Sequence, residues 1–369
     1  MILYGMQAPV LVRLTSLAST AFGGPDTSMD WCARLAGGRE VAVLANDQIA
    51  LWSLDGKRLT GPVGLENYRL GAAVTGAKDD VIVAAYRGGW VDLYTKEAKF
   101  MRRVQSGARD RDGSVALSSD GVTLAAVGLR EIGVISQLRE RAWGAALGPE
   151  GGRLVAVAAN GSRIVVDGPD NTLLSWSRDG AEAGSITLKA GDQAPDRRLS
   201  GLAVSPNGDA IAVAEEGSAV WLAYPTDKNV VRVALSARSV APLPDGTGFV
   251  IGLTDGTVAH LSRDGTLLKL PFKASELDAV SRIVVAPDGQ SFVVVEDDER
   301  HARQLAWDGK VLLGPYRANH AEMISGAFFH EGSPWLILRD VGSMADVTYA
   351  VVKLGPPNER QVKSLDPRR

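Results

Sequence analysis

The segment Ile283-Val284-Val285-Ala286-Pro287-Asp288-Gly289, followed after two residues by Phe292-Val293-Val294-Val295, joins two short apolar runs through a tight turn. An apolar run of about four residues between turn residues is typical of a strand covered on both faces. The pattern recurs, with turns that end at Gly38, Asp80, Gly121, Gly151, Gly208, Gly246, Gly289 and Gly332. The intervals between these positions are 42, 41, 30, 57, 38, 43 and 43 residues. We therefore expect eight repeats of about 42 residues, with the third truncated and the fourth carrying an insertion.

Each repeat is expected to form four short antiparallel strands. The second apolar run is followed by a turn and by a third strand that ends in an aromatic residue or leucine, as in Ile49-Ala50-Leu51-Trp52. An acidic turn such as Asp55-Gly56 comes next, and a fourth strand such as Arg58-Leu59-Thr60 leaves the repeat. Repetition of this unit predicts an all-β fold, a closed β-propeller of four-stranded antiparallel blades.

Closure of the ring favours eight blades. The eighth repeat supplies three strands and then runs into Gly355-Pro356-Pro357, so its fourth strand has to come from elsewhere. A propeller avoids a long exposed sheet edge only if its last blade is completed, and the N-terminal strand 9–15 can complete it. Residues 1–355 are thus predicted to form the propeller, and residues 356–369 a polar C-terminal tail. Seven blades are the alternative, if the weak repeat around residues 129–141 merges with a neighbour.

The strand ends carry a further pattern. Leu51-Trp52-Ser53-Leu54-Asp55-Gly56-Lys57 combines a Trp with an acidic turn, and Leu202-Ala203-Val204-Ser205-Pro206-Asn207-Gly208 shares its apolar run and turn with residues 283–289. In these features nearly the whole chain resembles the WD40 repeat family, with Ser53 in place of the Asp of the Trp-Asp pair. The family's Gly-His pair is missing, and only His320 lies about where that His would fall. The resemblance implies a bacterial WD40-like protein with a partner in a signalling or defence assembly.

Composition excludes several classes of protein. The chain has 369 residues, of which 45% are hydrophobic and 22% charged, which argues against wholesale disorder. A formal net charge of −3 gives no strong field for nucleic acid or an anionic membrane, so neither is expected as a partner. The single cysteine, Cys32, rules out an intramolecular disulfide. No apolar stretch is long enough to span a membrane and residues 1–24 do not resemble a signal peptide, so the protein is expected in the cytoplasm.

The common catalytic and phosphate-binding motifs are missing, because neither a Gly-x-Ser-x-Gly elbow nor a Gly-x-x-x-x-Gly-Lys-Ser/Thr loop occurs. His260, His301, His320 and His330 are separated by 41, 19 and 10 residues, so no short-range pair aims two imidazoles at one metal ion. His260 is predicted to be packed or hydrogen-bonded, and the loop 109–114 offers too few oxygens for calcium. No catalytic residue, cofactor or metal ligand is predicted. A metal site built from residues of several blades around the central channel is not excluded by the absence of a linear motif.

Recognition through loops is the remaining function. In a propeller, the connections from second to third strands and from fourth strands to the next blade gather on one face around the channel. The residues there that suit a protein interface are Tyr86, Arg87, Trp90, Arg130, Arg197, Arg198, Asp297, Asp298 and His320. Packing between blades is an alternative role for Trp90. The sequence thus predicts a non-catalytic platform for protein–protein interaction, a monomeric propeller within a hetero-complex. The alternative is an enzyme, or a small-molecule-binding or metal-binding propeller, that uses the central channel.

Overall fold

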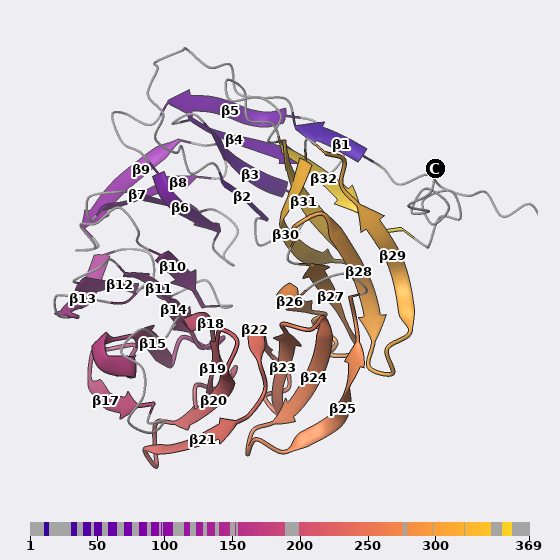
Figure 1. Ribbon diagram of the computed structural model, residues 1–369. Coiled ribbons are helices and arrows are strands. Elements are labelled where there is room, and N and C mark those ends of the chain that lie inside the picture. Colours follow the sequence, from indigo (N-terminus) through magenta and orange to yellow (C-terminus); the bar gives the residue numbers. More distant parts are fainter. Residues whose placement is uncertain are drawn as a thin grey trace, which may run out of the picture.

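The computed structural model is a ring of four-stranded sheets (Figure 1). It describes residues 11–14, 31–34, 40–45, 48–53, 58–64, 70–75, 81–86, 90–95, 97, 99–105, 114–118, 123–127, 131–136, 140–147, 152, 154–188, 199–275, 279–296, 298–320, 322–340 and 349–355. Within these residues the strands form eight sheets, each antiparallel throughout. The structure is therefore a closed all-β propeller, and the weak repeat around residues 129–141 keeps a blade of its own.

The first four blades come from the first half of the chain. Blade 1 contains β2 (Trp31–Arg34), β3 (Glu40–Ala45), β4 (Gln48–Ser53) and β5 (Arg58–Gly64); blade 2 contains β6 (Leu70–Thr75), β7 (Val81–Tyr86), β8 (Trp90–Thr95) and β9 (Phe100–Gln105); blade 3 contains β10 (Ser114–Leu117), β11 (Thr123–Val127), β12 (Glu131–Ser136) and β13 (Glu140–Ala146); and blade 4 contains β14 (Val155–Val157), β15 (Arg163–Asp167), the 3-10 turn η1 (Pro169–Asn171), β16 (Thr172–Ser177) and β17 (Glu182–Thr187).

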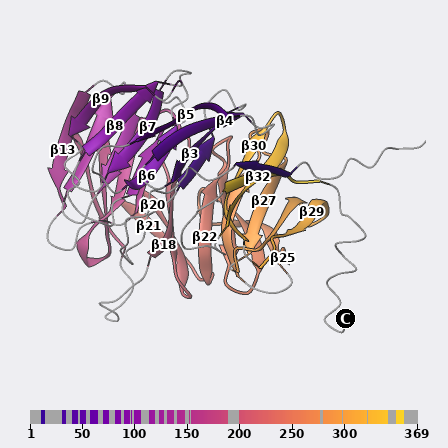
Figure 2. The ribbon, with the colours of Figure 1, turned by 90° about the horizontal axis from the view of Figure 1, so that it is seen from above.

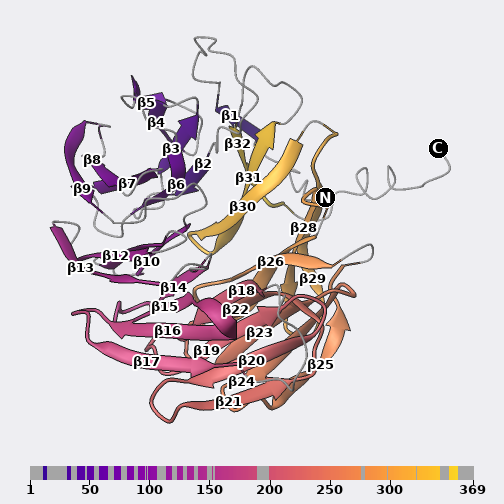
Figure 3. The same ribbon diagram turned by 60° about the vertical axis from the view of Figure 1, so that its left-hand side comes forward.

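The last four blades follow in the same order. Blade 5 contains β18 (Leu199–Val204), β19 (Ile211–Glu215), β20 (Ala219–Tyr224) and β21 (Asn229–Val233); blade 6 contains β22 (Ala237–Pro242), β23 (Gly248–Leu253), β24 (Thr257–Ser262) and β25 (Leu267–Lys273); blade 7 contains β26 (Val280–Val285), β27 (Ser291–Glu296), β28 (His301–Ala306) and β29 (Val311–Arg317); and blade 8 contains β30 (Glu322–His330), β31 (Ser333–Asp340), β32 (Tyr349–Lys353) and β1 (Leu11–Leu14). First strands lie toward the middle of the ring and fourth strands on its outside (Figures 1 and 3). Figure 2 shows the first strands β18 and β22 side by side. Among the described residues, no helix is long and apolar enough to cross a membrane.

Blade 4 corrects one prediction. The apolar run that follows the predicted turn at Gly151 includes Val155–Val157 and is therefore predicted to be a second strand. In the structure Val155–Val157 is the first strand of its blade and pairs with β15. The turn between these two strands contains Gly161 with a φ of 68°, in the place that Gly208 (φ of 80°) takes in blade 5. Spacings of 40 and 47 residues from Gly121 to Gly161 and on to Gly208 replace 30 and 57. The prediction of a truncated third repeat is therefore wrong. The fourth repeat is longer than the average repeat of about 42 residues, but by less than predicted, and a long segment separates β17 from β18. The prediction relied on aliphatic content, and Val155–Val157 is as apolar as the second strands of the other blades although it is a first strand.

The cores lie between neighbouring blades. Alternate residues of a strand point to opposite faces of its sheet, so a second strand covered on both sides serves two cores. In β19, Val213 packs with Leu173 of blade 4, whereas Ala212 and Ala214 pack with Ile251 of blade 6. All five residues of β19 are buried. Because each blade shelters its apolar faces only against its neighbours, the ring is stable as a whole and not blade by blade.

A β-bulge recurs near the start of the first strand in five blades, where the register shifts by one residue. In three of these blades the extra residue is a serine, namely Ser200, Ser281 or Ser325, and its hydroxyl donates to a carbonyl of the second strand. A bulge re-aims the side chains beside it. In blade 7 the bulge lies at Ser281, next to the end of β27, where the second turn of the blade begins.

The ring is closed by a strand from each end of the chain. β1 pairs antiparallel with β32, with Leu11 opposite Val352 and Leu14 opposite Tyr349. β1 thereby takes the fourth, outer place of blade 8, inside the predicted range 9–15. The predicted tail, residues 356–369, lies outside the described residues.

Removal of residues 1–14 is expected to expose the backbone N–H and C=O groups along β32, which then becomes an edge strand that another chain can pair with. We expect a midpoint of thermal unfolding several degrees lower and elution as dimers or larger species in size-exclusion chromatography. Removal of residues 356–369 is the matched control and is expected to leave both measurements unchanged. A truncated protein that stays monomeric and melts like the full chain would show that this pairing is dispensable.

Candidate functional site

The second-to-third-strand turn of blade 7 gathers three side chains with metal-binding or acid–base chemistry. β27 ends at Glu296 and β28 begins at His301, and Asp298 lies in the turn between them. The amide of Glu299 donates to the Glu296 carbonyl at 2.9 Å and closes the turn. Ser281, in the bulge of the neighbouring first strand, donates its hydroxyl to the same carbonyl at 3.0 Å. The end of β27 is therefore held from two sides.

Asp298 and His301 are directly hydrogen-bonded. Oδ2 of Asp298 lies 2.6 Å from Nδ1 of His301, while Oδ1 accepts from the backbone amides of Arg300 at 2.9 Å and of His301 at 3.2 Å. The Asp298 side chain is 29% exposed and that of His301 only 7%. The local sequence explains this arrangement, because an aspartate in a turn readily accepts hydrogen bonds from the backbone two residues further on.

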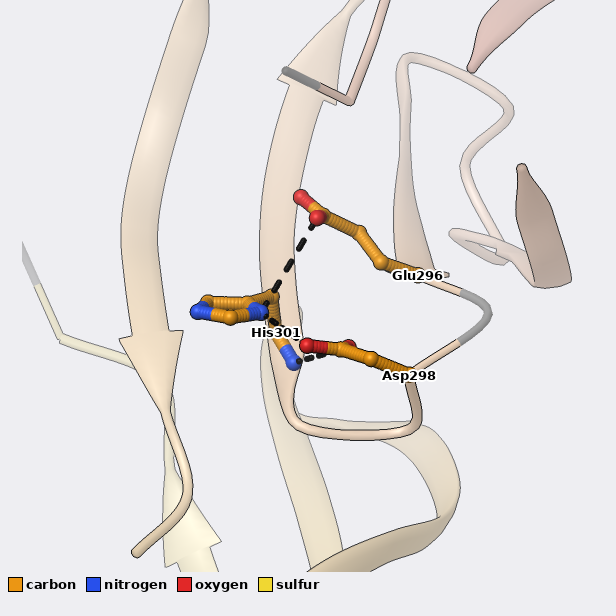
Figure 4. A group of neighbouring side chains, drawn as sticks. All are labelled: Glu296, Asp298 and His301. Carbon is orange, nitrogen blue, oxygen red and sulfur yellow. Dashed lines mark hydrogen bonds and ion pairs between the residues drawn. The ribbon is translucent and has the colours of Figure 1, made fainter. Parts of the chain in front are cut away.

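Glu296 is fully buried and faces the same imidazole. Its Oε1 accepts from Nη2 of Arg303 at 2.8 Å, and its Oε2 lies 3.9 Å from Nδ1 of His301. Figure 4 shows the carboxylates of Glu296 and Asp298 pointing toward His301, one from the end of the strand and one from the turn. Among the described residues, neither Glu296 Oε2 nor His301 Nε2 has a hydrogen-bond partner.

These three side chains offer one nitrogen and two carboxylate oxygens that all lie within 4.8 Å of one another. Such a set can hold a divalent metal ion, or it can orient a histidine as a general base. For nucleophilic catalysis the histidine would have to hydrogen-bond a hydroxyl or thiol. In the described residues His301 makes no such bond, since Nδ1 faces carboxylates and Nε2 has no partner. The group is therefore better suited to binding a cation than to activating a nucleophile.

Charged residues of the turn are also tied to the connection between blades 7 and 8. Arg300 donates from Nη2 to the carbonyl of His320 at 3.4 Å, and its own carbonyl accepts from the amide of Ala318 at 2.8 Å. Arg282 of β26 lies 3.4 Å from Glu299 and also donates to the carbonyl of Ser325 in blade 8. We call Arg282, Glu299, Arg300 and His320 the charged face of blade 7. It lies at the end of the blade where its second turn and its crossover to blade 8 meet.

The sequence-based site residues divide into three groups. The structure brings Asp298 and His320 to the same end of blade 7, linked through Arg300. Trp90 is the half-buried first residue of β8, and Tyr86 ends β7 in the same blade, its side chain outside the described residues. The others lie outside the described residues altogether, namely Arg87, Arg130, Arg197, Arg198 and Asp297.

The sequence-based site residues include Asp298 in the second turn of blade 7 but not Glu296 and His301, which flank that turn. The pattern Glu296-x-Asp298-x-x-His301 places a carboxylate at the end of one predicted strand and an imidazole at the start of the next. A search for pairs of histidines passes over this pattern. In blade 5, Glu215 at the end of β19 is also buried and accepts at 2.7 Å from the indole N–H of Trp221. A carboxylate at this strand end thus has a built partner in both blades.

A hollow of about 330 Å³ lies between blades 6 and 7, at the end of their strands opposite to Glu296, Asp298 and His301. It is lined by Leu243, Pro244, Asp245, Thr247, His260, Pro287, Asp288, Gly289, Gln290 and Trp307. The ring of His260 stacks on Trp307 with centroids 5.0 Å apart, so the prediction that His260 is packed or hydrogen-bonded is confirmed through packing. Hydrogen bonding from the Thr247 backbone amide lowers the pKa of Asp245, which therefore presents a carboxylate to this hollow.

The comparisons with known proteins agree with this architecture. The Dos1 propeller matches with 15% sequence identity and a TM-score of 0.62, over 92% of this chain and 94% of that one. BamB from Moraxella catarrhalis matches with 14% identity and a TM-score of 0.63, over 93% of this chain and 99% of its own. The chain shares the propeller fold. No protein-family model matches the sequence, and no curated protein matches it. At identities this low the similarity concerns the fold alone.

Proposed function

We propose that this chain is a non-catalytic, WD40-like propeller that acts in the bacterial cytoplasm as an interaction platform, a monomer within a hetero-complex of a signalling or defence system. The warrant is physical. A ring of blades that share their cores is rigid, and turns mounted on such a scaffold can present side chains in a fixed arrangement. A preorganised surface loses little conformational freedom on binding, which favours affinity.

The charged face of blade 7 is the observation that carries the proposal. The Arg282 side chain is 45% exposed and that of Glu299 30%, and the side chain of His320 is exposed as well. The segments that carry these residues are fixed by the hydrogen bonds between the turn and the crossover. The arginines offer planar, multidentate donors, and arginine is among the residue types that concentrate binding energy at interfaces. We therefore expect a partner with carboxylates or backbone carbonyls that meet this face.

A small-molecule-binding propeller is the second candidate, and the hollow between blades 6 and 7 favours it. Its volume of about 330 Å³ falls at the lower end of ligand sites, and stacked His260 and Trp307 stand beside the carboxylates of Asp245 and Asp288. This hollow lies between two blades, at the far end of the strands from the charged face, so the two candidate functions can be tested by separate substitutions.

The proposal is tested by measuring how tightly the purified chain binds its partner. A partner that copurifies in stoichiometric amount from the native host is identified, and its affinity is measured with the wild-type chain and with the double variant Arg282→Ala and Arg300→Ala. We expect the double variant to weaken binding by about tenfold or more, because arginine is among the residues that concentrate binding energy at interfaces. A tenfold loss of affinity corresponds to about 1.4 kcal/mol.

Lys310→Ala is the matched control, because Lys310 is an exposed cation of the same blade at the opposite end of its strands. It is expected to bind the partner as the wild type does. Equal binding by the double variant and the wild type would reject the charged face as the interface. Loss of a bound small molecule on substitution of Asp245 would favour the second candidate instead.

A further inference from the structure

We infer that Glu296, Asp298 and His301 form a binding site for one divalent transition-metal ion, with Zn²⁺ as the reference case. This site is independent of the protein partner proposed above. The evidence for the site is the set of donor atoms and the burial of Glu296, and metal binding can be measured on the purified chain alone.

The spacing of the donor atoms suits a metal ion. Zinc binds nitrogen and carboxylate oxygen at about 2.0–2.2 Å, so the donors of a tetrahedral site lie roughly 3.4 Å apart. Here Nδ1 of His301 is 2.6 Å from Asp298 Oδ2 and 3.9 Å from Glu296 Oε2, distances that fall on either side of that value. The ion would take the place of the proton in the hydrogen bond between His301 and Asp298. Small side-chain rotations are enough, because all three donors already lie within 4.8 Å.

The buried oxygen of Glu296 is the independent sign of a ligand. The side chain has no exposure to solvent, and among the described residues Oε2 accepts no hydrogen bond although it faces the imidazole. A buried carboxylate oxygen without a partner is costly, and most such atoms in proteins are satisfied. A cation between Glu296, Asp298 and His301 would satisfy it.

Two carboxylates, Glu296 and Asp298, stand against one guanidinium at this site, so the local charge still favours a cation. Arg303 pairs with Oε1 of Glu296 and neutralises one carboxylate, and it leaves Oε2 free to face the cluster. The remaining carboxylate, Asp298, lies at the more exposed side, where an ion would enter. An ion bound here would join the end of β27, the turn and the start of β28, and so would stiffen the segment that carries the charged face.

The donor set also selects the kind of ion. One imidazole and two carboxylates without sulfur suit Zn²⁺, Co²⁺, Mn²⁺ or Fe²⁺. Calcium requires six to eight oxygen ligands, and magnesium favours near-octahedral oxygen coordination with several waters, so neither is expected to compete. With three protein ligands, a fourth position stays open for water or for a group of a partner.

The experiment uses the full chain after dialysis against a chelator. Isothermal titration calorimetry with Zn²⁺ is expected to give one ion per chain, and elemental analysis after desalting is expected to recover it. Co²⁺ in place of Zn²⁺ is expected to give the intense visible bands of four- or five-coordinate cobalt. An excess of Ca²⁺ or Mg²⁺ is expected to leave both results unchanged. Failure to bind Zn²⁺ in stoichiometric amount, or a cobalt spectrum like that of the aquo ion, would overturn the proposal.

Substitutions locate the site. Asp298→Asn and His301→Gln are expected to weaken binding of Zn²⁺ by at least about tenfold. The matched controls are Asp308→Asn, an exposed acid in another turn of blade 7, and His330→Gln in blade 8, and both are expected to bind as the wild type does. Circular dichroism verifies the fold of each variant. Equal affinity in all four variants, or equal loss in the controls, would place the bound ion elsewhere and overturn the assignment.

Discussion

Arg303→Ala is expected to lower the free energy of unfolding by about 3–5 kcal/mol, because it leaves the carboxylate of Glu296 charged and buried without its ion-pair partner. The Glu296 side chain has no exposure and that of Arg303 only 12%, so the carboxylate is largely shielded from water and the loss of the guanidinium is poorly compensated. The measurement is urea denaturation followed by tryptophan fluorescence, with a chelator present so that no metal ion compensates for the missing charge.

Arg238→Ala is the control for this prediction. Arg238 pairs with Glu216 at the same end of the neighbouring blades, but both side chains are about one third exposed. Exposed ion pairs contribute only about 0–1 kcal/mol, so the control is expected to lose little stability. Replacing both Glu296 and Arg303 with leucine is expected to recover most of the loss, since an apolar pair removes the uncompensated charge. A cost for Arg303→Ala no greater than that for Arg238→Ala would contradict the buried-pair account.

Phe292→Ala is expected to cost about 3–5 kcal/mol of stability through the cavity that it leaves. Phe292 has no exposure and packs in the core shared by blades 6 and 7, with its ring centroid 4.8 Å from that of Trp307 and 6.2 Å from that of Phe272. Close-packed interiors relax only in part around a missing side chain, so both blades lose contacts at once. The free energy of unfolding from denaturant titration gives the result.

Phe100→Ala makes the same chemical change at the outer strand of blade 2. Phe100 is 54% exposed, and its one described ring contact is edge-to-face with Tyr94 at 5.9 Å. The loss there is expected to be about 1 kcal/mol, the value of one aromatic pair. Similar losses at Phe292 and Phe100 would mean that the interface between blades 6 and 7 is not a tightly packed core.

Much of the fold follows from local sequence. Turn residues and runs of aliphatic residues report strand ends and two-sided burial, and both are properties of a few neighbouring residues. The same locality explains the error in blade 4, where Val155–Val157 is apolar enough to pass for a second strand. Only its pairing with β15, which depends on the turn at Gly161, shows that it is the first.

The site was less accessible to sequence reasoning. Asp298 and His320 were proposed because they lie in turns, which is a matter of chain order. That Glu296 is completely buried, that Arg303 takes one of its oxygens, and that the other oxygen faces His301 depend on side-chain packing within blade 7. No spacing rule contains that information, because a carboxylate at a strand end is ordinarily solvated.

The sequence by itself determined the repeating unit and its four strands and favoured eight blades over seven, because hydrophobic runs and turn residues act over a few positions and their spacing repeats along the chain. Tertiary structure alone decided which strand begins blade 4, how β1 meets β32, and which charged side chains lose their water. Those outcomes depend on contacts between residues far apart in the chain and on burial, where a charge must find a partner or be paid for in stability.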